Sequence, residues 1–201
     1  MGKRFSHIYD AAMLPFEKLR FKKIRKELVG KSKGRTLEIG SGTGLNFSYY
    51  YQTEQVDAIE PDPFMAQKSL KRKREALVPI RIHSADAESL PFADCTFDTI
   101  IATLVFCTIP SPEQAIREII RVSKPNARIL LLEHIRMEQK WLGAAQDWLT
   151  PLWKKVCDGC HLNRNTLALF KQTDGLTIEN ADLCYNGLFF VMKASCDKEK
   201  Q

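Results

Sequence analysis

Short apolar runs alternate with helical patterns between residues 35 and 134. Five runs rich in β-branched and other apolar residues predict strands at 35–40, 56–61, 80–84, 97–103 and 127–134. Between them, apolar positions at helical spacing predict helices over 64–77 and 112–122, the second with Ser111 as N-cap and Pro112 in its first turn. This alternation is typical of βα units on a parallel sheet, and the continuous apolar runs at 99–105 and 129–132 indicate strands buried on both faces.

Two flanking segments carry helical patterns of their own. Residues 5–29 predict N-terminal helices that place Phe21, Ile24 and Leu28 on one apolar stripe. The basic residues of that segment, Lys22, Lys23, Arg25 and Lys26, are expected to face away from the stripe. Residues 141–173 predict further helix, with three tryptophans and a break at Pro151.

The end of the chain returns to a strand pattern at 176–183 and 188–194. Asn186-Gly187 between these runs is a strong signal for a β-hairpin. The sequence therefore predicts an α/β fold of the Rossmann-like, doubly wound kind, with a mostly parallel seven-stranded sheet and an antiparallel C-terminal hairpin.

Composition narrows the class of protein without naming an activity. A chain of 201 residues with 44% hydrophobic and 27% charged residues suits one globular domain, and no apolar run reaches the ~18 residues of a membrane-spanning helix. Six scattered cysteines without an export signal suggest reduced thiols and a cytoplasmic protein. The net charge of +6 favours an anionic partner (nucleic acid, anionic lipid or an acidic small molecule) or is merely the charge of a soluble basic protein.

The most informative motif follows the first predicted strand, where Gly40, Gly42 and Gly44 lie two residues apart, ahead of an expected helix. Glycines here let a ligand approach the backbone closely. The dinucleotide-binding spacing needs its third glycine where Leu45 stands, and no Gly-Lys-Ser/Thr phosphate loop is present. The spacing therefore favours the zwitterionic tail of an amino acid over a phosphate.

Glu60 ends the second predicted strand, twenty residues after Gly40. A doubly wound fold presents an acid at this place, where its carboxylate can accept hydrogen bonds from both ribose hydroxyls. The same charge would repel a 2′-phosphate.

These motifs resemble the successive motifs of class I S-adenosylmethionine methyltransferases of the small "type 11" group. The likeness covers about residues 5–134 through 37–44, Glu60, Asp86-Ala87 and the block 91–100. Within the group the chain is most similar to quinone C-methyltransferases, to phospholipid N-methyltransferases and to the methyltransferase-like seven thiol methyltransferases. It departs from the family at 124–127, Lys-Pro-Asn-Ala, where Lys-Pro-Gly-Gly is usual.

The resemblance implies S-adenosylmethionine as cofactor and a role for each matching residue. Residues 40–44 would hold the methionine moiety, Glu60 the ribose, Asp62 and Met65 the adenine flanks, and Asp86 with Ala87 the adenine edge. Thr103 would face the donor sulfur, and Tyr9 would close over the cofactor as part of an N-terminal lid. The implied cofactor-binding set is Tyr9, Glu38, Gly40, Ser41, Gly42, Gly44, Glu60, Asp62, Met65, Asp86, Ala87 and Thr103.

The chain is expected to form a single domain, 1–201, with four parts: lid helices at 1–30, a cofactor-binding core at 31–135, a helical substrate-side insert at 136–175 and a closing hairpin at 176–195. Methyl transfer is a direct displacement that needs alignment above all, and a base only where the acceptor must lose a proton. His134, at the end of the fifth strand, and His161, in the insert, are the candidate catalytic bases.

The acceptor is expected to be a small apolar or lipid-like molecule, with the residues Leu104, Val105, Phe106 and Ile109 and the tryptophans of the insert forming an apolar wall. Peripheral membrane contact through the basic N-terminal helix stays open, as does the oligomeric state. Two alternatives remain: a module that binds S-adenosylmethionine or its product without turnover, and an RNA-directed methyltransferase. Nucleic acid is not expected, because Thr103-Leu-Val-Phe106 stands where base methyltransferases carry an Asn/Asp-Pro-Pro-Tyr/Phe block.

The run Cys157-Asp-Gly-Cys160-His161 has the spacing of a haem-attachment motif and offers three zinc ligands. No second ligand pair at suitable spacing accompanies it. We therefore expect no metal, and a packing role for these residues.

Overall fold

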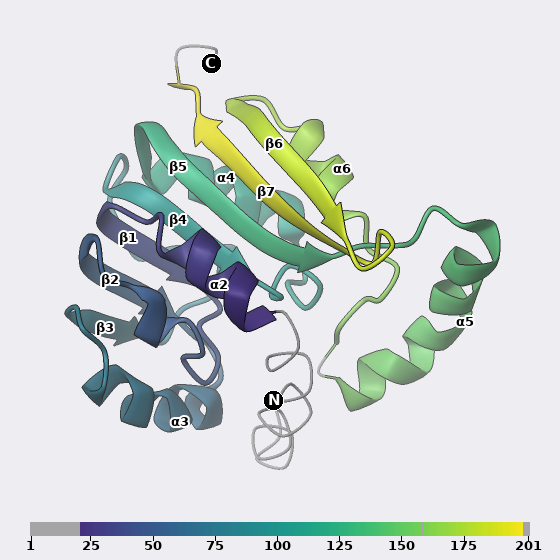
Figure 1. Cartoon of the computed structure of the whole chain (residues 1–201), viewed down its shortest axis with the longest axis horizontal. Helices are drawn as coiled ribbons and strands as arrows, with labels where there is room; N and C mark the ends of the chain where they lie inside the picture. The colour runs from purple at the N-terminus through teal and green to yellow at the C-terminus, as the bar shows by residue number, and fades with distance from the viewer. Residues whose placement is uncertain (1–20, 158, 199–201) are drawn as a thin grey trace.

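The computed structural model describes residues 21–157 and 159–198, and within them seven strands form one sheet in the order β3-β2-β1-β4-β5-β7-β6 (Figure 1). The strands are β1 (Gly34–Ile39), β2 (Thr53–Ile59), β3 (Ile80–His83), β4 (Phe97–Thr103), β5 (Ser123–His134), β6 (Leu176–Cys184) and β7 (Phe189–Cys196). The helices are α2 (Lys22–Val29), α3 (Pro63–Arg74), α4 (Pro112–Val122), α5 (Lys140–Val156) and α6 (Thr166–Lys171), with a short 3-10 turn, η2 (Phe47–Tyr49).

The strand pairing confirms the predicted sheet. The pairs β1–β2, β1–β4, β2–β3 and β4–β5 are parallel, whereas β7 runs antiparallel to both β5 and β6. Asn186 and Gly187 lie in the turn between β6 and β7 with positive φ values of 57° and 86°, a conformation that these two residue types adopt most readily.

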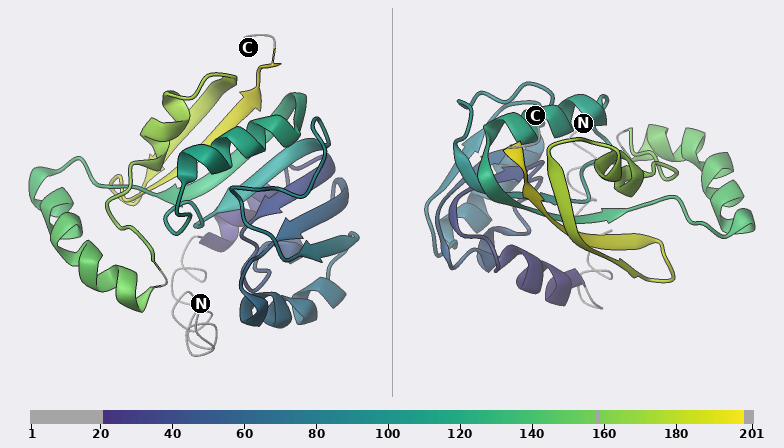
Figure 2. Two further views of the ribbon diagram at one scale, coloured as in Figure 1. Left: turned by 180° about the vertical axis from the view of Figure 1, so that it is seen from behind. Right: turned by 90° about the horizontal axis from the view of Figure 1, so that it is seen from above.

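Helices cover both faces of the sheet, and each face has its own apolar core (Figure 2). On one face, α4 and α6 pack against β4, β5 and the hairpin, with Ile116, Ile119 and Phe170 fully or almost fully buried. On the other face, α2 and η2 cover β1, β2 and β5. Successive residues of β4 and β5 point into alternate cores, which is why these strands are apolar throughout.

Three sequence-based expectations about the helices were wrong. The glycine loop is followed by the 3-10 turn η2 and not by a longer helix, because Tyr50 leaves the helical conformation and its hydroxyl turns inward to Glu38. Pro151 lies inside α5 and does not break it; the proline is exposed, so water can solvate the carbonyl that its missing N–H leaves free.

The third correction concerns Arg25, which was expected to face away from the apolar stripe of α2. The Arg25 side chain is only 2% exposed, like those of Phe21 and Leu28, and it donates hydrogen bonds to Asn46 and Thr103. The N-terminal stripe therefore packs within the protein. Residues 5–20 of the predicted N-terminal helices lie outside the described residues, and so does Tyr9.

Two further details, at the start of α4 and at Asn126 in β5, also bear on what the sequence predicted. Ser111 occupies the N-cap position of α4 as expected, although its side chain makes no capping hydrogen bond. Asn126 stands where the family usually has glycine and adopts a φ of 61°. In residues 21–157 and 159–198, no helix combines the length and the apolar character that crossing a membrane requires.

Candidate functional site

Apart from Tyr9, which lies outside the described residues, the residues predicted to bind a cofactor lie at or just beyond the carboxyl ends of β1, β2, β3 and β4, which are neighbours in the sheet. In doubly wound folds this edge is where ligands bind. Asp86 is exposed just beyond β3, and the neighbouring Ala87 is buried. The structure thus brings the ends of four separate strands to one edge of the molecule.

The glycine loop is shaped for close approach at Gly42. Gly40 and Gly42 both have positive φ, 62° and 55°. A Cβ at Gly40 would clash with Val105 Cγ2, so a glycine is required there by packing. A Cβ at Gly42 would meet no atom within 4 Å, so the bare backbone there faces open space. The Ser41 hydroxyl beside it is buried and has no hydrogen-bond partner among the described residues.

Glu60 connects the loop to the end of β2. Its two carboxylate oxygens accept hydrogen bonds from the backbone N–H groups of Gly42 (2.7 Å) and Asp62 (2.9 Å). Asp62 in turn caps α3, since its Oδ1 accepts from the N–H groups of Phe64 and Met65, both at 2.8 Å. Asp62 therefore has a structural role as a helix cap, and Met65 is buried below it.

Beneath the loop lies a buried polar network that the sequence did not predict. Arg25 Nη1 donates to Asn46 Oδ1 (2.9 Å) and to Thr103 Oγ1 (2.7 Å). Asn46 Nδ2 donates to Glu38 Oε1 (2.9 Å) and to Thr103 Oγ1 (3.0 Å), and the Tyr50 hydroxyl donates to Glu38 Oε2 (2.8 Å). Burial raises the pKa of Glu38 to about 7 despite these donors and the nearby guanidinium. The network joins α2, β1, η2 and β4 directly under the glycine loop.

A sharp turn follows β4 on the side of the fifth strand. Leu104 has a φ of 56°, which is strained for a residue with a branched side chain. Glu133 Oε1 accepts from the N–H groups of Val105 (2.8 Å) and Phe106 (3.1 Å), and Arg164 donates to the carbonyl of Phe106. Burial raises the pKa of Glu133 to about 7.

This turn changes the predicted apolar wall. Phe106 is fully buried and packs edge-on against Phe170, and Ile109 belongs to the same core, so neither residue lines an open site. Leu104 and Val105 are partly exposed. The tryptophans at 141 and 148 project into solvent, 72% and 82% exposed.

Next to the turn, three donor side chains from separate segments meet. Cys107 Sγ, a ring nitrogen of His134 and Cys160 Sγ all lie within 4.8 Å of one another, and all three residues are buried. The distance between Cys160 Sγ and His134 Nε2 is 3.4 Å. A hydrogen bond from the Cys107 thiol, together with the His134 imidazole, lowers the pKa of Cys160, while the same contact raises the pKa of Cys107.

The two predicted bases therefore have different surroundings. His134 lies at the carboxyl end of β5 in this group of donors, and its Nδ1 has no hydrogen-bond partner within the described ranges. His161 is half-buried; its backbone N–H donates to the carbonyl of Cys107, and burial lowers the pKa of its side chain. Neither Cys157 nor His161 belongs to the group formed by Cys107, His134 and Cys160.

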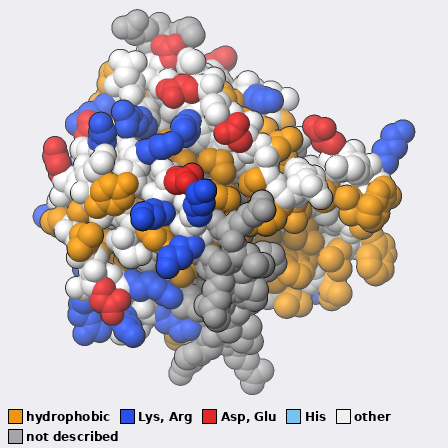
Figure 3. Space-filling view, viewed as in Figure 1, with side chains coloured by type: hydrophobic (Ala, Val, Ile, Leu, Met, Phe, Trp, Pro, Cys, Tyr) orange, Lys and Arg blue, Asp and Glu red, His pale blue; other side chains and the backbone are white. Residues whose placement is uncertain are grey.

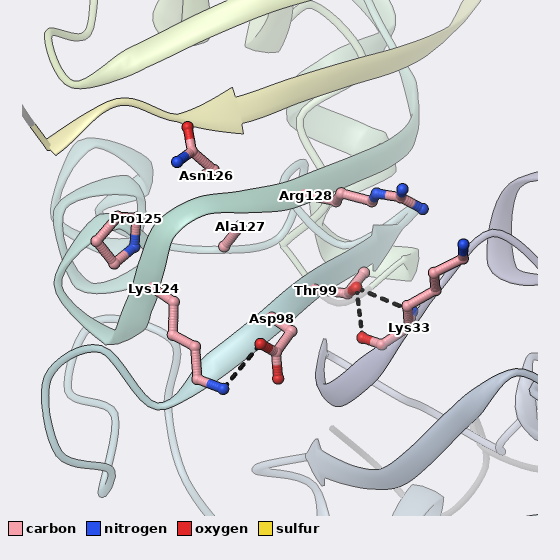
Figure 4. A pocket seen from close by; sticks show the side chains of 8 residues that line it. All are labelled: Lys33, Asp98, Thr99, Lys124, Pro125, Asn126, Ala127 and Arg128. Atoms are coloured by element: carbon pink, nitrogen blue, oxygen red, sulfur yellow. Dashed lines mark hydrogen bonds and ion pairs between the residues drawn. The ribbon is translucent and has the colours of Figure 1, made fainter.

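A depression of about 210 Å³ lies at the other end of the strands, where Lys124 forms an ion pair of 2.7 Å with Asp98 (Figure 4). It is lined by Lys33, Asp98, Thr99, Lys124, Pro125, Asn126, Ala127 and Arg128. Because it lies beside the start of β4 and the first half of β5, it is separate from the glycine loop.

The strand order, the glycine loop after β1 and the acid after β2 define an S-adenosylmethionine-binding fold of the methyltransferase class. The bare backbone at Gly42, the buried Ser41 hydroxyl and the apolar turn after β4 fit that cofactor. Residues 37–131 match the family model described as a methyltransferase domain.

The human thiol S-methyltransferase TMT1A is 30% identical over 167 residues, covering 81% of this chain and 68% of that protein. The phosphatidylethanolamine N-methyltransferase of Cereibacter sphaeroides is 30% identical over 118 residues, 58% of each chain. Among solved structures, the N-methyltransferase NodS from Bradyrhizobium japonicum in complex with S-adenosyl-L-homocysteine has a TM-score of 0.69 at 14% identity, covering 92% of this chain and 89% of that one. The chain belongs to the S-adenosylmethionine-dependent methyltransferase family.

The buried Glu38 carboxyl predicts how stability depends on pH. Its pKa is raised from an ordinary value of 4.5 to about 7, so the folded protein keeps a proton that the unfolded chain loses. The free energy of unfolding of the cofactor-free protein should therefore fall as the pH rises from about 4.5 to about 7. Glu38→Gln should remove roughly 3 kcal/mol of that fall, measured by urea denaturation at several pH values.

Glu118→Gln is the matched control, because a hydrogen bond from Arg121 lowers the pKa of Glu118. Its contribution is lost as the pH falls, so the decline between pH 4.5 and 7 should persist in this variant. An equally steep decline in Glu38→Gln and in the wild type would contradict the prediction.

Proposed function

We propose that this protein transfers the methyl group of S-adenosylmethionine to a small apolar acceptor by direct displacement. The observation that carries the proposal is the shape of the carboxyl edge: open backbone at Gly42, an acid at Glu60, and a partly exposed apolar turn at Leu104 and Val105. The cofactor supplies an activated methyl group, so the protein needs to orient two molecules and exclude water. Orientation alone supplies about 7–11 kcal/mol in favourable cases.

Each residue at the edge has a proposed task. The backbone of residues 40–44 and the Ser41 hydroxyl bind the methionine tail, Glu60 binds the ribose hydroxyls, and Met65, Asp86 and Ala87 surround the adenine. Glu38 and Thr103 act from below, because both are tied into the network that fixes the loop. The role of Tyr9 as part of a lid rests on the resemblance alone.

Cofactor binding tests the placement of the ribose. Calorimetry on the wild type should show binding of S-adenosylmethionine and of its demethylated product, and none of NAD or ATP. Glu60→Gln should weaken binding about tenfold, since roughly 1–3 kcal/mol follows from a lost charged hydrogen-bond partner. Glu54→Gln is the matched control, because Glu54 lies exposed at the opposite end of the same strand. Unchanged affinity in Glu60→Gln would reject this placement of the ribose.

An alkyl thiol is the first acceptor class to test. The names of two relatives point to thiols and to phosphatidylethanolamine, and the resemblance adds quinones. From Thr103 to Pro110 there is no carboxylate that could act as a base on a carbon acid. A thiol of ordinary pKa near 8.5 is partly ionised at neutral pH and makes a smaller demand on a base.

The acceptor class is decided by methyl transfer from radiolabelled S-adenosylmethionine to a panel of alkyl thiols, quinols, phospholipids and RNA. We expect label in a small apolar thiol, and about tenfold less of that label in Glu60→Gln when the concentration of S-adenosylmethionine is well below its dissociation constant. Label only in RNA would refute the acceptor class while leaving methyl transfer intact. Cofactor binding without label in any acceptor would instead favour a binding module.

An exposed apolar face on α5 suggests how an apolar acceptor is reached. The exposed side chains recur at helical spacing on one side: Trp141, Ala145, Trp148, Leu152 and Val156. The inner side of the helix combines the half-buried Leu142 and Leu149 with Gln146, which donates to the carbonyls of Ile135 and Leu162, and the exposed Asp147 pairs with Arg136 at 2.8 Å. Unlike an ordinary surface helix, α5 therefore turns large apolar side chains to solvent, and they contribute to the orange surface beside the sheet in Figure 3.

A lipid surface of anionic charge is the partner that this face fits best. Lys140, Lys154 and Lys155 lie on the same exposed helix, and the chain carries a net charge of +6. Tryptophans flanked by lysines are typical of helices that lie in a membrane interface. We therefore infer peripheral membrane contact through α5 and not through α2, whose stripe is buried.

Intrinsic tryptophan fluorescence reads this contact directly, because all three tryptophans of the chain lie in α5. Vesicles containing phosphatidylserine should shift the emission to shorter wavelength and sediment the protein at low salt. Trp148→Ser should weaken that partitioning about tenfold, from a lost burial of roughly 1.5–3 kcal/mol. Leu77→Ser, which removes another exposed apolar side chain, is the control. Self-association that depends on Trp148, without vesicle binding, would show that a second copy covers the face.

A further inference from the structure

We propose that Cys107, His134 and Cys160 form a binding site for a soft divalent metal ion, zinc in the first place. The three side chains come from the turn after β4, the end of β5 and the segment between α5 and α6, and their donor atoms lie within 4.8 Å of one another in the folded chain. Two sulfur donors and one imidazole nitrogen are a ligand set that zinc prefers, and all three residues are buried.

The geometry suits a tetrahedral ion. With Zn–S near 2.3 Å and Zn–N near 2.0–2.1 Å, two ligands of one tetrahedron lie about 3.6 Å apart. The distance between Cys160 Sγ and His134 Nε2 is 3.4 Å. Small changes of side-chain torsion would place the Cys107 sulfur at a similar distance, since it already lies within 4.8 Å of Cys160 Sγ and of a ring nitrogen of His134.

Charge balance supports the same set. On binding, each thiol would release its proton to solvent and donate a lone pair to the metal, so that two thiolates neutralise the double positive charge. A zinc ion with two thiolates has no net charge, so burying it costs much less solvation free energy than burying an isolated ion. Three protein ligands leave one tetrahedral position, which is the arrangement of catalytic and not of structural zinc sites.

The surrounding structure holds the three ligands in place. Glu133 and Arg164 fix the backbone of the turn that carries Cys107, through the N–H groups of Val105 and Phe106 and the carbonyls of Phe106 and Ile109. The carbonyl of Cys107 accepts from the backbone N–H of His161, next to Cys160. No metal was expected from the sequence because only Cys157, Cys160 and His161 were considered as ligands. Of these three residues, only Cys160 belongs to the group seen in the structure.

The open fourth position of the metal could bind the methyl acceptor. A thiol bound there would lose its proton to solvent and keep its sulfur nucleophilic towards the methyl group. The acceptor sulfur would then form a bond to the methyl carbon as the bond from that carbon to the donor sulfur breaks. This point rests on the proposed function, whereas metal binding itself does not.

The test is metal content of the full chain. Protein stripped with a chelator and titrated with zinc should bind one ion per chain, and cobalt should give the charge-transfer absorption of cobalt–thiolate bonds. Cys160→Ser, Cys107→Ser and His134→Ala should each weaken binding by at least about tenfold, as loss of a ligand or its support does. Cys157→Ser and His161→Ala are the matched controls and should bind like the wild type.

Circular dichroism and binding of S-adenosylmethionine show whether each variant is folded, and the titration of the wild type stands even if a variant is not. The proposal is overturned if the wild-type chain takes up no zinc or cobalt. It is also overturned if Cys160→Ser and Cys107→Ser bind the metal as well as the wild type does. A change in the cobalt spectrum when an alkyl thiol is added supports the open position. No change would reject it and leave the metal site and the methyltransferase function unaffected.

Discussion

A buried carboxylate with few donors is unstable, and the site depends on how this chain holds Glu38. Asn46 and Tyr50 give it two hydrogen bonds, and Asn46 in turn is held by Arg25 and by Thr103. Because these residues come from four elements, the network fixes the distance between the ends of β1 and β4 and the path of the loop between β1 and η2. The glycine loop is thus supported from below by polar contacts and not by a long helix, and space remains beside Gly42 where a ligand can approach the backbone.

The sheet could be read from the chain because its signals are local and periodic. All seven strands were predicted, and the bounds predicted for β4 and α4 agree with the structure, since β-branched runs and the Ser111-Pro112 start are visible over a few residues. Two of the three wrong expectations, the helix after the glycine loop and the orientation of Arg25, depend on tertiary contacts. Arg25 lies four residues after Phe21 and three before Leu28, so helical spacing places it on the apolar stripe, unlike its basic neighbours. Its charge favoured solvent, and what holds it inside are the acceptors at Asn46 and Thr103.

In the candidate site, too, the residues with a local sequence signal were predicted and the contacts made by the fold were not. Gly42 and Glu60 were predicted from their register along the chain, and the structure joins them by a hydrogen bond. Cys107 and Cys160 are 53 residues apart, and their meeting depends on where β4 ends and how the segment between α5 and α6 returns to it. The sequence signal at Cys157, Cys160 and His161 was real as a pattern, but the backbone turn at Gly159, with a φ of 78°, leaves only Cys160 in that group. Spacing therefore identified one member of the group and two residues outside it.

The turn after β4 and helix α5, which the proposed function assigns to the acceptor, are built on opposite physical principles. The turn from Leu104 to Cys107 is rigid: a strained residue is held by Glu133 on one side and by Arg164 on the other, and strain of this kind persists only where the surroundings enforce it. Helix α5 makes polar contacts with the rest of the chain through Gln146 and Asp147 and exposes Trp141, Trp148, Leu152 and Val156 to water, which disfavours them. A rigid turn next to buried sulfur and nitrogen donors suits chemistry, and an outward apolar helix suits capture of a molecule that water holds poorly. The proposed acceptor, a small apolar thiol that reacts through its sulfur, would satisfy both.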